Sequence, residues 1–212
     1  MSEIELQLAV KMTCNGCVED IKSALSPLGL SNIQCDLAKG TVLVSGNAAP
    51  SAIVDAIKGT GRDVIVRGTG APNSAAVCIL EDTEGTPQGL VRIIQMTDTV
   101  FDVSVSPSVF DMYGPVVSLT LQEYGSVQQG ALSTGPVSTV ILQLNSPNAT
   151  GLAHHGIPVA SMLGRAMAVS PPAGPVENSL VGIVGRSAGI WELDKKICSC
   201  SGRSMWEEPK LV

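Results

Sequence analysis

The sequence predicts a multidomain protein with an N-terminal α+β domain, a central all-β sandwich or barrel, and a short flexible C-terminal tail. Three observations predict this class. Residues 1–68 contain both the apolar alternation of strands and the apolar repeat of helices. In the middle of the chain, short β-type runs are separated by turn residues. The C-terminal segment is short and polar. At 212 residues with 44% hydrophobic content, the chain is long enough to bury such cores.

The first strand and the first helix are predicted from two different periods. Apolar residues alternate with polar ones along the first run, at Ile4, Leu6, Leu8 and Val10. This alternation places one face of a strand in the core. After a short loop, apolar residues recur at helical spacing, at Val18, Ile21, Leu25 and Leu28.

The remaining elements complete a β-α-β-β-α-β order. Strands at 32–35 and 41–44 are predicted to form a hairpin, and a second helix at 49–58 has Pro50 in its first turn. A short strand at 64–66 follows. This order is the ferredoxin-like split arrangement, in which a sheet buries one face under two helices.

Composition changes after this domain. Residues 69–74 are rich in turn formers and predict a linker, and the region from 75 to 191 is predicted to be the all-β domain. Its β-type runs are 76–80, 90–95, 100–105, 116–121, 139–144 and 180–184. Residues 192–212 are too short and polar to bury a core, and they predict a mobile tail.

The net charge, the N-terminal sequence and the number of cysteines exclude some classes of function and favour others. The net charge of −6 and the pI near 4.8 argue against nucleic acid or an anionic membrane as a partner. The N-terminus lacks a secretory h-region, and no apolar run is long enough to span a bilayer, so we expect no integral membrane protein. We expect a cytoplasmic location, with the mitochondrial intermembrane space as a second one. Six cysteines in such a compartment predict metal or thiol chemistry.

The loop Met12-Thr13-Cys14-Asn15-Gly16-Cys17 predicts a soft-metal site. Cys17 lies at or near the start of a helix, where backbone N–H groups and the helix dipole favour a thiolate. In the predicted fold the loop after the second helix lies at the same end, so Lys58 or Arg62 would add positive charge. Two thiolates without histidine or carboxylate partners favour Cu(I) or zinc. Met12 and Arg62 are the predicted supporting residues of the loop.

The sequence of this loop also allows three other interpretations of Cys14 and Cys17. A thioredoxin-like pair would make the protein a thiol-disulfide oxidoreductase, although the loop has neither the preceding aromatic residue nor the intervening proline. A zinc-binding protein would use Cys14 and Cys17 together with Cys198 and Cys200, because zinc prefers four ligands. Two unrelated buried thiols are the third alternative.

The tail pair Cys198-Ser199-Cys200 could share a metal or close a small, strained disulfide. Strained, exposed disulfides are oxidising and tend to be passed on to other thiols. Cys35 and Cys78 have no cysteine close to them in the sequence, and we expect them to be buried apolar thiols.

Two sets of motifs carry a resemblance to known families. The loop at 12–17 resembles the heavy-metal-associated domain of copper chaperones. The segments 187–192, 198–200 and 205–208 resemble the C-terminal end of the copper chaperone for superoxide dismutase in its fungal form. Between them the chain is similar to Cu,Zn superoxide dismutase, at Glu123-Tyr124-Gly125-Ser126, Ser133-Thr134-Gly135-Pro136 and Val181-Gly182-Ile183-Val184-Gly185.

This resemblance implies that Cys14 and Cys17 bind Cu(I), and that Cys198 and Cys200 take part in copper transfer and in disulfide formation in the target. It also implies a Greek-key central domain that docks onto Cu,Zn superoxide dismutase as a heterodimer. Residues 182–187 are predicted to be a strand and its exit, close to the part that resembles the dismutase dimer interface, and we hypothesise that Arg186 contributes to this contact. We further expect a homodimer, and a membrane copper importer as the copper donor.

The central domain departs from the dismutase pattern at its metal ligands. Thr120, Gln122 and Val137 stand where the resemblance implies histidines, and Ala131 and Val181 stand where it implies a disulfide. The sequence contains only two histidines, His154 and His155, and adjacent residues of a strand point to opposite faces. We therefore expect a copper metallochaperone without dismutase activity, and not an enzyme.

Overall fold

The computed structural model describes residues 3–146, 150–193 and 203–207. The chain divides into two compact units. Among the described residues, the first unit comprises 3–75 with 187–193 and 203–207, and the second comprises 76–146 and 150–186. Within the described residues, no helix is both long and apolar enough to cross a membrane.

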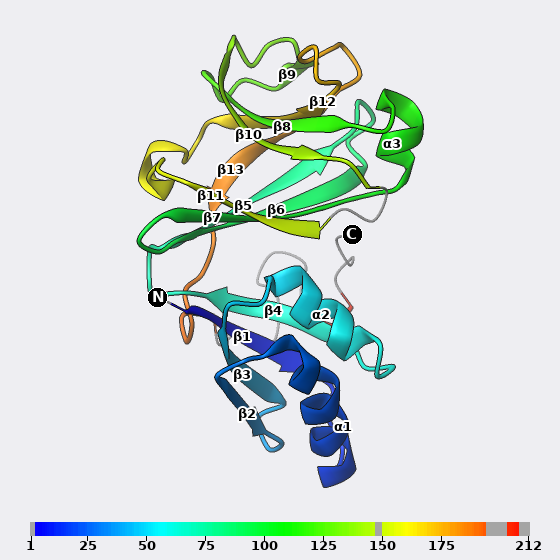
Figure 1. Cartoon of the computed structure of the whole chain (residues 1–212), viewed down its shortest axis with the longest axis vertical. Coiled ribbons are helices and arrows are strands. Elements are labelled where there is room, and N and C mark those ends of the chain that lie inside the picture. Colours follow the sequence, from blue (N-terminus) through cyan, green and yellow to red (C-terminus); the bar gives the residue numbers. More distant parts are fainter. Residues whose placement is uncertain (1–2, 147–149, 194–202, 208–212) are drawn as a thin grey trace. The chain divides into compact units, whose positions relative to one another are not determined.

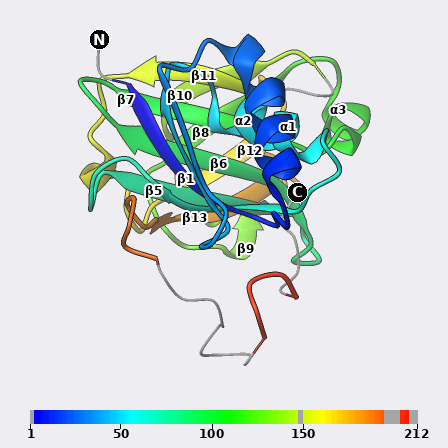
Figure 2. The ribbon, with the colours of Figure 1, turned by 90° about the horizontal axis from the view of Figure 1, so that it is seen from below.

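The first unit has the predicted β-α-β-β-α-β order (Figure 1). Its sheet has the strand order β2-β3-β1-β4, and each neighbouring pair is antiparallel. Helices α1 and α2 lie side by side on one face of this sheet (Figures 1 and 2). The elements are β1 (Ile4–Val10), α1 (Asn15–Leu25), β2 (Asn32–Asp36), β3 (Thr41–Gly46), α2 (Pro50–Lys58) and β4 (Val64–Thr69).

The core of the first unit follows the two periods of the sequence. Leu6 and Leu8 of β1 are fully buried, and they pack with helix residues that recur at helical spacing, such as Ile21 and Leu25. Each leucine buried in this way contributes about 1.5–3 kcal/mol to stability. The sequence pattern therefore determines which face of β1 the helices cover. The loop that follows β1 then lies at one end of the sheet.

The second unit is an all-β structure built on an eight-stranded antiparallel sheet that curls as a dismutase-like barrel does (Figure 1). The strand order is β10-β8-β12-β13-β5-β6-β7-β11. The strands are β5 (Ala75–Glu81), β6 (Pro87–Gln95), β7 (Thr99–Val105), β8 (Val117–Gln122), β10 (Val137–Leu144), β11 (Thr150–His155), β12 (Ala166–Ser170) and β13 (Leu180–Arg186). A short strand β9 (Gln128–Ala131) and a helix α3 (Ser108–Tyr113) complete the unit.

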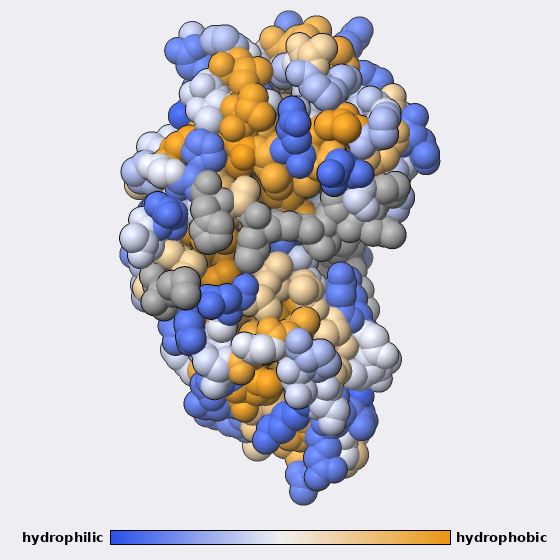
Figure 3. Space-filling model, in the orientation of Figure 1, coloured by the Kyte–Doolittle hydropathy of each residue, from blue (hydrophilic) through white to orange (hydrophobic). Residues whose placement is uncertain are grey.

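The core of the second unit is mostly apolar, and it also holds a buried ion pair. Phe101, Leu119 and Leu121 are fully buried in its core. Arg92 Nη1 lies 3.2 Å from Asp102 Oδ2, and the Asp102 side chain is fully buried. Figure 3 shows apolar side chains exposed on the face where β10 lies, and the exposed apolar residues of this strand are Val137 and Val140.

The structure adds elements that the sequence patterns did not predict. All five residues of β12 are buried, so the strand has no polar alternation to reveal it. Helix α3 spans Ser108–Tyr113 and is too short for a helical repeat. β4 extends through Thr69 into the predicted linker, and residues from Ser187 onward group with the first unit, whereas the predicted all-β domain ran to residue 191.

Candidate metal site

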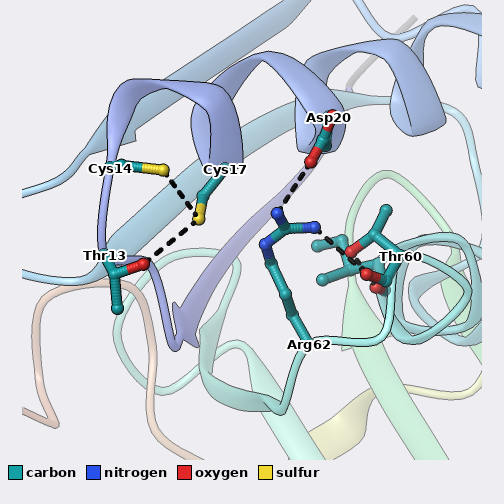
Figure 4. Close-up of polar contacts among 7 residues, drawn as sticks. Thr13, Cys14, Cys17, Asp20, Thr60 and Arg62 are labelled. Atoms are coloured by element: carbon teal, nitrogen blue, oxygen red, sulfur yellow. Dashed lines mark hydrogen bonds and ion pairs between the residues drawn. The ribbon is translucent and has the colours of Figure 1, made fainter.

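The two cysteines of the Cys14/Cys17 loop lie side by side at the start of α1 (Figure 4). Cys14 is the N-cap residue with extended backbone, and the Cys17 N–H donates a hydrogen bond to the Cys14 carbonyl. The two sulfur atoms are 3.5 Å apart, and both thiols are free. Two sulfurs at this separation can both lie at about 2.3 Å from one ion, as thiolate ligands of zinc do.

The two thiols differ in access. Cys14 is exposed, whereas Cys17 keeps 8% of its surface exposed. A Cβ at Gly16 would make only an ordinary contact with the Cys14 sulfur, at 3.7 Å, so the exposure of Cys14 does not depend on this glycine. The loop therefore presents one sulfur to an incoming group and holds the other against the protein.

Cys17 is a thiolate at neutral pH. Hydrogen bonds from the Thr13 backbone, and next from the Arg62 guanidinium, lower the pKa of its thiol from 9.0 to about 6. The Thr13 hydroxyl oxygen, 3.6 Å from the Cys17 sulfur, and the Cys14 backbone act in the same direction. A metal ion thus meets at least one ligand that is already deprotonated.

Arg62 comes to the site from the loop after α2, as the predicted fold requires. Its Nη2 lies 2.7 Å from Asp20 Oδ2 on α1, and its Nη1 donates to the Thr60 carbonyl at 3.1 Å (Figure 4). The contact with the Cys17 thiolate, and then that with Asp20, raises the pKa of the guanidinium. Lys58, the other predicted source of charge, is not among the groups that shift Cys17.

Sequence reasoning missed two residues of this site, Thr13 and Asp20. Thr13 directly precedes Cys14, so its hydroxyl was available as a hydrogen-bond partner from the loop sequence alone. Asp20 lies one helical turn after Cys17, which was the signal that it could meet a cation facing the same side of α1. Met12 is half-buried and packs against the core of the first unit.

The remaining predicted residues lie elsewhere. Cys198 and Cys200 fall outside the described residues, and Arg186 is exposed as the last residue of β13. Within the described residues, no group of three or more His, Cys, Asp or Glu side chains could hold a metal. Burial raises the pKa of both other thiols: Cys78 is fully buried with a pKa near 12, and Cys35 is half-buried.

The positions that resemble dismutase ligands carry an alternative polar arrangement. The Gln122 Nε2 donates to Thr120 Oγ1 at 2.6 Å inside the second unit, and both side chains are buried. Val137 pairs with Gln122 across β10 and β8. The three positions are therefore neighbours, but an amide, a hydroxyl and an aliphatic group occupy them.

Comparisons with known proteins identify the family to which this chain belongs. The heavy-metal-associated domain model matches residues 7–63. A superoxide dismutase 1 copper chaperone of Debaryomyces hansenii is 37% identical, over 96% of this chain and 94% of that protein. The protein of the same name from Kluyveromyces lactis is 36% identical, over 99% and 94%. The solved copper(I)-loaded first domain of the human copper chaperone for SOD1 is 28% identical, covers 33% of this chain and 100% of that chain, and has a TM-score of 0.31. The chain therefore belongs to the superoxide dismutase 1 copper chaperone family.

Proposed function

We propose that this protein is a metallochaperone that carries Cu(I) on Cys14 and Cys17 and delivers it to Cu,Zn superoxide dismutase. The observation that carries the proposal is the pair of sulfurs 3.5 Å apart, one of them a thiolate beside Arg62. Soft sulfur ligands favour Cu(I) over hard cations. The protein has no dismutase activity of its own, because Thr120, Gln122 and Val137 supply no copper ligand.

The site supports transfer by ligand exchange. Two thiolates and one Cu(I) carry a net negative charge, which the Arg62 guanidinium offsets. A two-coordinate Cu(I) ion leaves space for a third sulfur ligand. An incoming thiolate reaches the ion from the side of Cys14, because this cysteine is exposed. The ion can then pass through three-sulfur intermediates to the target without entering solution.

The geometry favours copper carriage over thiol-disulfide exchange at this loop. An attacking thiol of an oxidoreductase needs both a low pKa and access. Here the lowered pKa belongs to Cys17, which is buried, while the exposed thiol is Cys14. A structural zinc ion needs four ligands; the described residues around the loop supply the two sulfurs, and the other two of that alternative, Cys198 and Cys200, lie outside the described residues.

We propose that the second unit docks the target on the outer side of the β5 and β13 strands. A cavity of about 790 Å³ opens there. Its lining combines apolar side chains with carboxylates, the apolar ones being Val77, Ile79, Val181 and Ile183, and the acidic ones Glu81, Asp82 and Glu177. Arg186 follows this lining at the end of β13 and adds a positive charge to the docking surface.

The tail pair is proposed to supply the disulfide step. A thiolate of the target attacks a Cys198–Cys200 disulfide to form a mixed disulfide, and a second target thiolate then displaces the tail sulfur. The target leaves with its disulfide, and the tail leaves as a dithiol that has accepted two electrons. The homodimer, the copper importer as donor and the two cellular locations stay predictions.

Cu(I) titration of the full chain under anaerobic, reducing conditions tests the cargo site. We expect Cys14→Ser/Cys17→Ser to lose the copper held by the Cys14/Cys17 loop, and the further substitution of Cys198 and Cys200 by serine to abolish tight uptake. Cys35→Ser is the matched control, because this thiol is half-buried and lies on β2. Undiminished uptake by the fourfold variant would refute the proposal.

A heterodimer assay with Cu,Zn superoxide dismutase tests the docking surface. We expect Arg186→Glu to weaken binding, and Ile79→Glu to weaken it more, since the latter places a charge among the apolar residues of the cavity. Lys39→Glu makes the same charge reversal at an exposed position of the first unit and should bind as the wild type does. Equal affinity for all four proteins would show that the target binds elsewhere.

A further inference from the structure

The segment that follows the second unit runs along the free edge of the first unit's sheet. β4 is the last strand in the order β2-β3-β1-β4, so its outer edge has no sheet partner. The Thr69 N–H donates to the Ala188 carbonyl at 3.0 Å, and the Ile190 N–H donates to the Gly70 carbonyl at 3.0 Å. An exposed edge is a template for an added strand, and here the chain itself supplies one.

Two glycines permit the close approach of these backbones. A Cβ on Gly189 would lie 2.7 Å from the Pro72 nitrogen and 2.8 Å from its Cα, which real Cβ atoms do not do. A Cβ on Gly68 would collide with the Gly189 carbonyl oxygen. The backbone around Gly189 is therefore in close van der Waals contact with β4 and with the residues that follow it.

The next residues attach the tail to β1. The Trp191 N–H donates a 2.7 Å hydrogen bond to Oε1 of Gln7, whose side chain is buried in the middle of β1. The Gly189 N–H also bonds to Glu192 Oε2 at 2.6 Å, which closes the turn. The start of the tail is therefore fixed to the strand that leads into the Cys14/Cys17 loop.

A second attachment lies just beyond the C-terminal end of the same strand. The ring of Trp206 lies over the Lys11 ammonium, with 5.1 Å between Nζ and the ring centroid. Asp63 holds this ammonium in place, since its Oδ2 is 2.8 Å from Nζ. The tail residues around Trp206 form their own turn, in which the Ser204 N–H and hydroxyl both bond to Glu207 Oε2.

We propose that β1 and the residue after it, Lys11, form the docking strip of the C-terminal tail, with Gln7 and Lys11 as its two attachment points and Lys11 as a positioning residue for the tail. The chain between Trp191 and Trp206 is then tied at both ends to the unit that carries Cys14 and Cys17. Given the proposed function, the tail acts from the copper-carrying unit, and it stays with that unit while the target occupies the second one.

Fluorescence of Trp206 tests the attachment at Lys11 in the copper-free, full-length protein. Trp191→Phe keeps the backbone N–H that bonds to Gln7 and leaves Trp206 as the single tryptophan. In this background we expect Lys11→Ala to shift the docking equilibrium about two- to fivefold toward the free tail, the loss expected for a cation–π contact at an exposed site. Acrylamide quenching of Trp206 should rise accordingly, and Lys22→Ala, an exposed lysine of α1, should leave it unchanged. Equal quenching in all three proteins would overturn this attachment.

Limited proteolysis tests the attachment along β4. Gly189→Ala should accelerate cleavage within residues 187–193, because its Cβ cannot fit beside Pro72. Gly156→Ala is the matched control, since a Cβ at Gly156 meets no atom within 4 Å. Unchanged cleavage of Gly189→Ala would show that the segment is not held there.

The two tests of tail docking can fail independently of the copper-binding test at Cys14 and Cys17. Neither readout involves copper, so a free tail would leave the Cu(I) titration of Cys14 and Cys17 as it is. If Trp206 is shielded from acrylamide but copper uptake does not depend on the cysteines, the proposed function is wrong. The docking of the tail on β1 and Lys11 would still hold.

Discussion

Asp20 of α1 holds the guanidinium of Arg62 at 2.7 Å, one helical turn beyond Cys17. The arginine side chain is largely buried, with 17% of its surface exposed, and it comes from the loop after α2. Because Asp20 and the Thr60 carbonyl both bind this guanidinium, its position beside the Cys17 sulfur is fixed by two elements that are far apart in the sequence. The acidity of the thiol therefore depends on the packing of the whole unit.

Replacing Arg62 by glutamine should raise the pKa of Cys17. The substitution removes a charged hydrogen-bond donor to the thiolate, which is the second largest contribution to its lowered pKa. Ultraviolet absorbance of the thiolate, followed as a function of pH in the copper-free protein, measures the change. Lys58→Gln removes a charge at the end of α2 and should leave the titration in place. An unchanged midpoint in Arg62→Gln would contradict the assigned contact.

The copper-free protein should become more stable as the pH rises from about 6 to about 9. In this interval the folded protein holds Cys17 as a thiolate, whereas the unfolded chain still binds the proton at an ordinary pKa of 9.0. The unfolded state then binds more protons, so the free energy of unfolding increases with pH and this gain is lost as the pH falls through 6. Urea unfolding at several pH values measures it, and Cys17→Ser should flatten the slope in this window.

Copper uptake should show a matching pH dependence. Ligand sulfurs must be deprotonated to bind, so below a pH of about 6 the ion has to displace a proton from Cys17. We expect the apparent affinity of the first unit for Cu(I) to fall more steeply with acid below this pH than above it. Competition with a chelator whose own pH dependence is known gives the affinity. In Arg62→Gln the steep region should begin at a higher pH.

Asp102→Ala should strongly destabilise the second unit. The carboxylate is fully buried and pairs with Arg92, so its removal leaves a poorly solvated guanidinium in the interior. Breaking such a pair costs about 3–5 kcal/mol. Calorimetry, which can resolve separate transitions, should show the loss, and Asp111→Ala on the exposed side of α3 should change little. A loss well below 1 kcal/mol would mean that the pair contributes little to folding.

Much of the first unit could be predicted from its sequence because its elements are amphipathic. The alternation of Leu6 and Leu8 and the helical spacing of Ile21 and Leu25 both identify the buried faces that the structure shows. The approach of Arg62 to the cysteine loop also followed from the order of elements. β12 was not predictable in this way, because a strand that is buried on both faces carries no alternation.

By itself, the sequence determined the two fold classes and the loop that carries Cys14 and Cys17, since these depend on local periodicity and residue chemistry. The resemblance to Cu,Zn superoxide dismutase implied the loss of its ligands at Thr120, Gln122 and Val137. Only the tertiary structure decided that Cys17 is the acidic thiol, that Trp191 returns to Gln7 of β1, and that Trp206 returns to Lys11 just after this strand. These results depend on groups that are remote in sequence. No local pattern encodes which free strand edge or which ammonium a returning segment will meet.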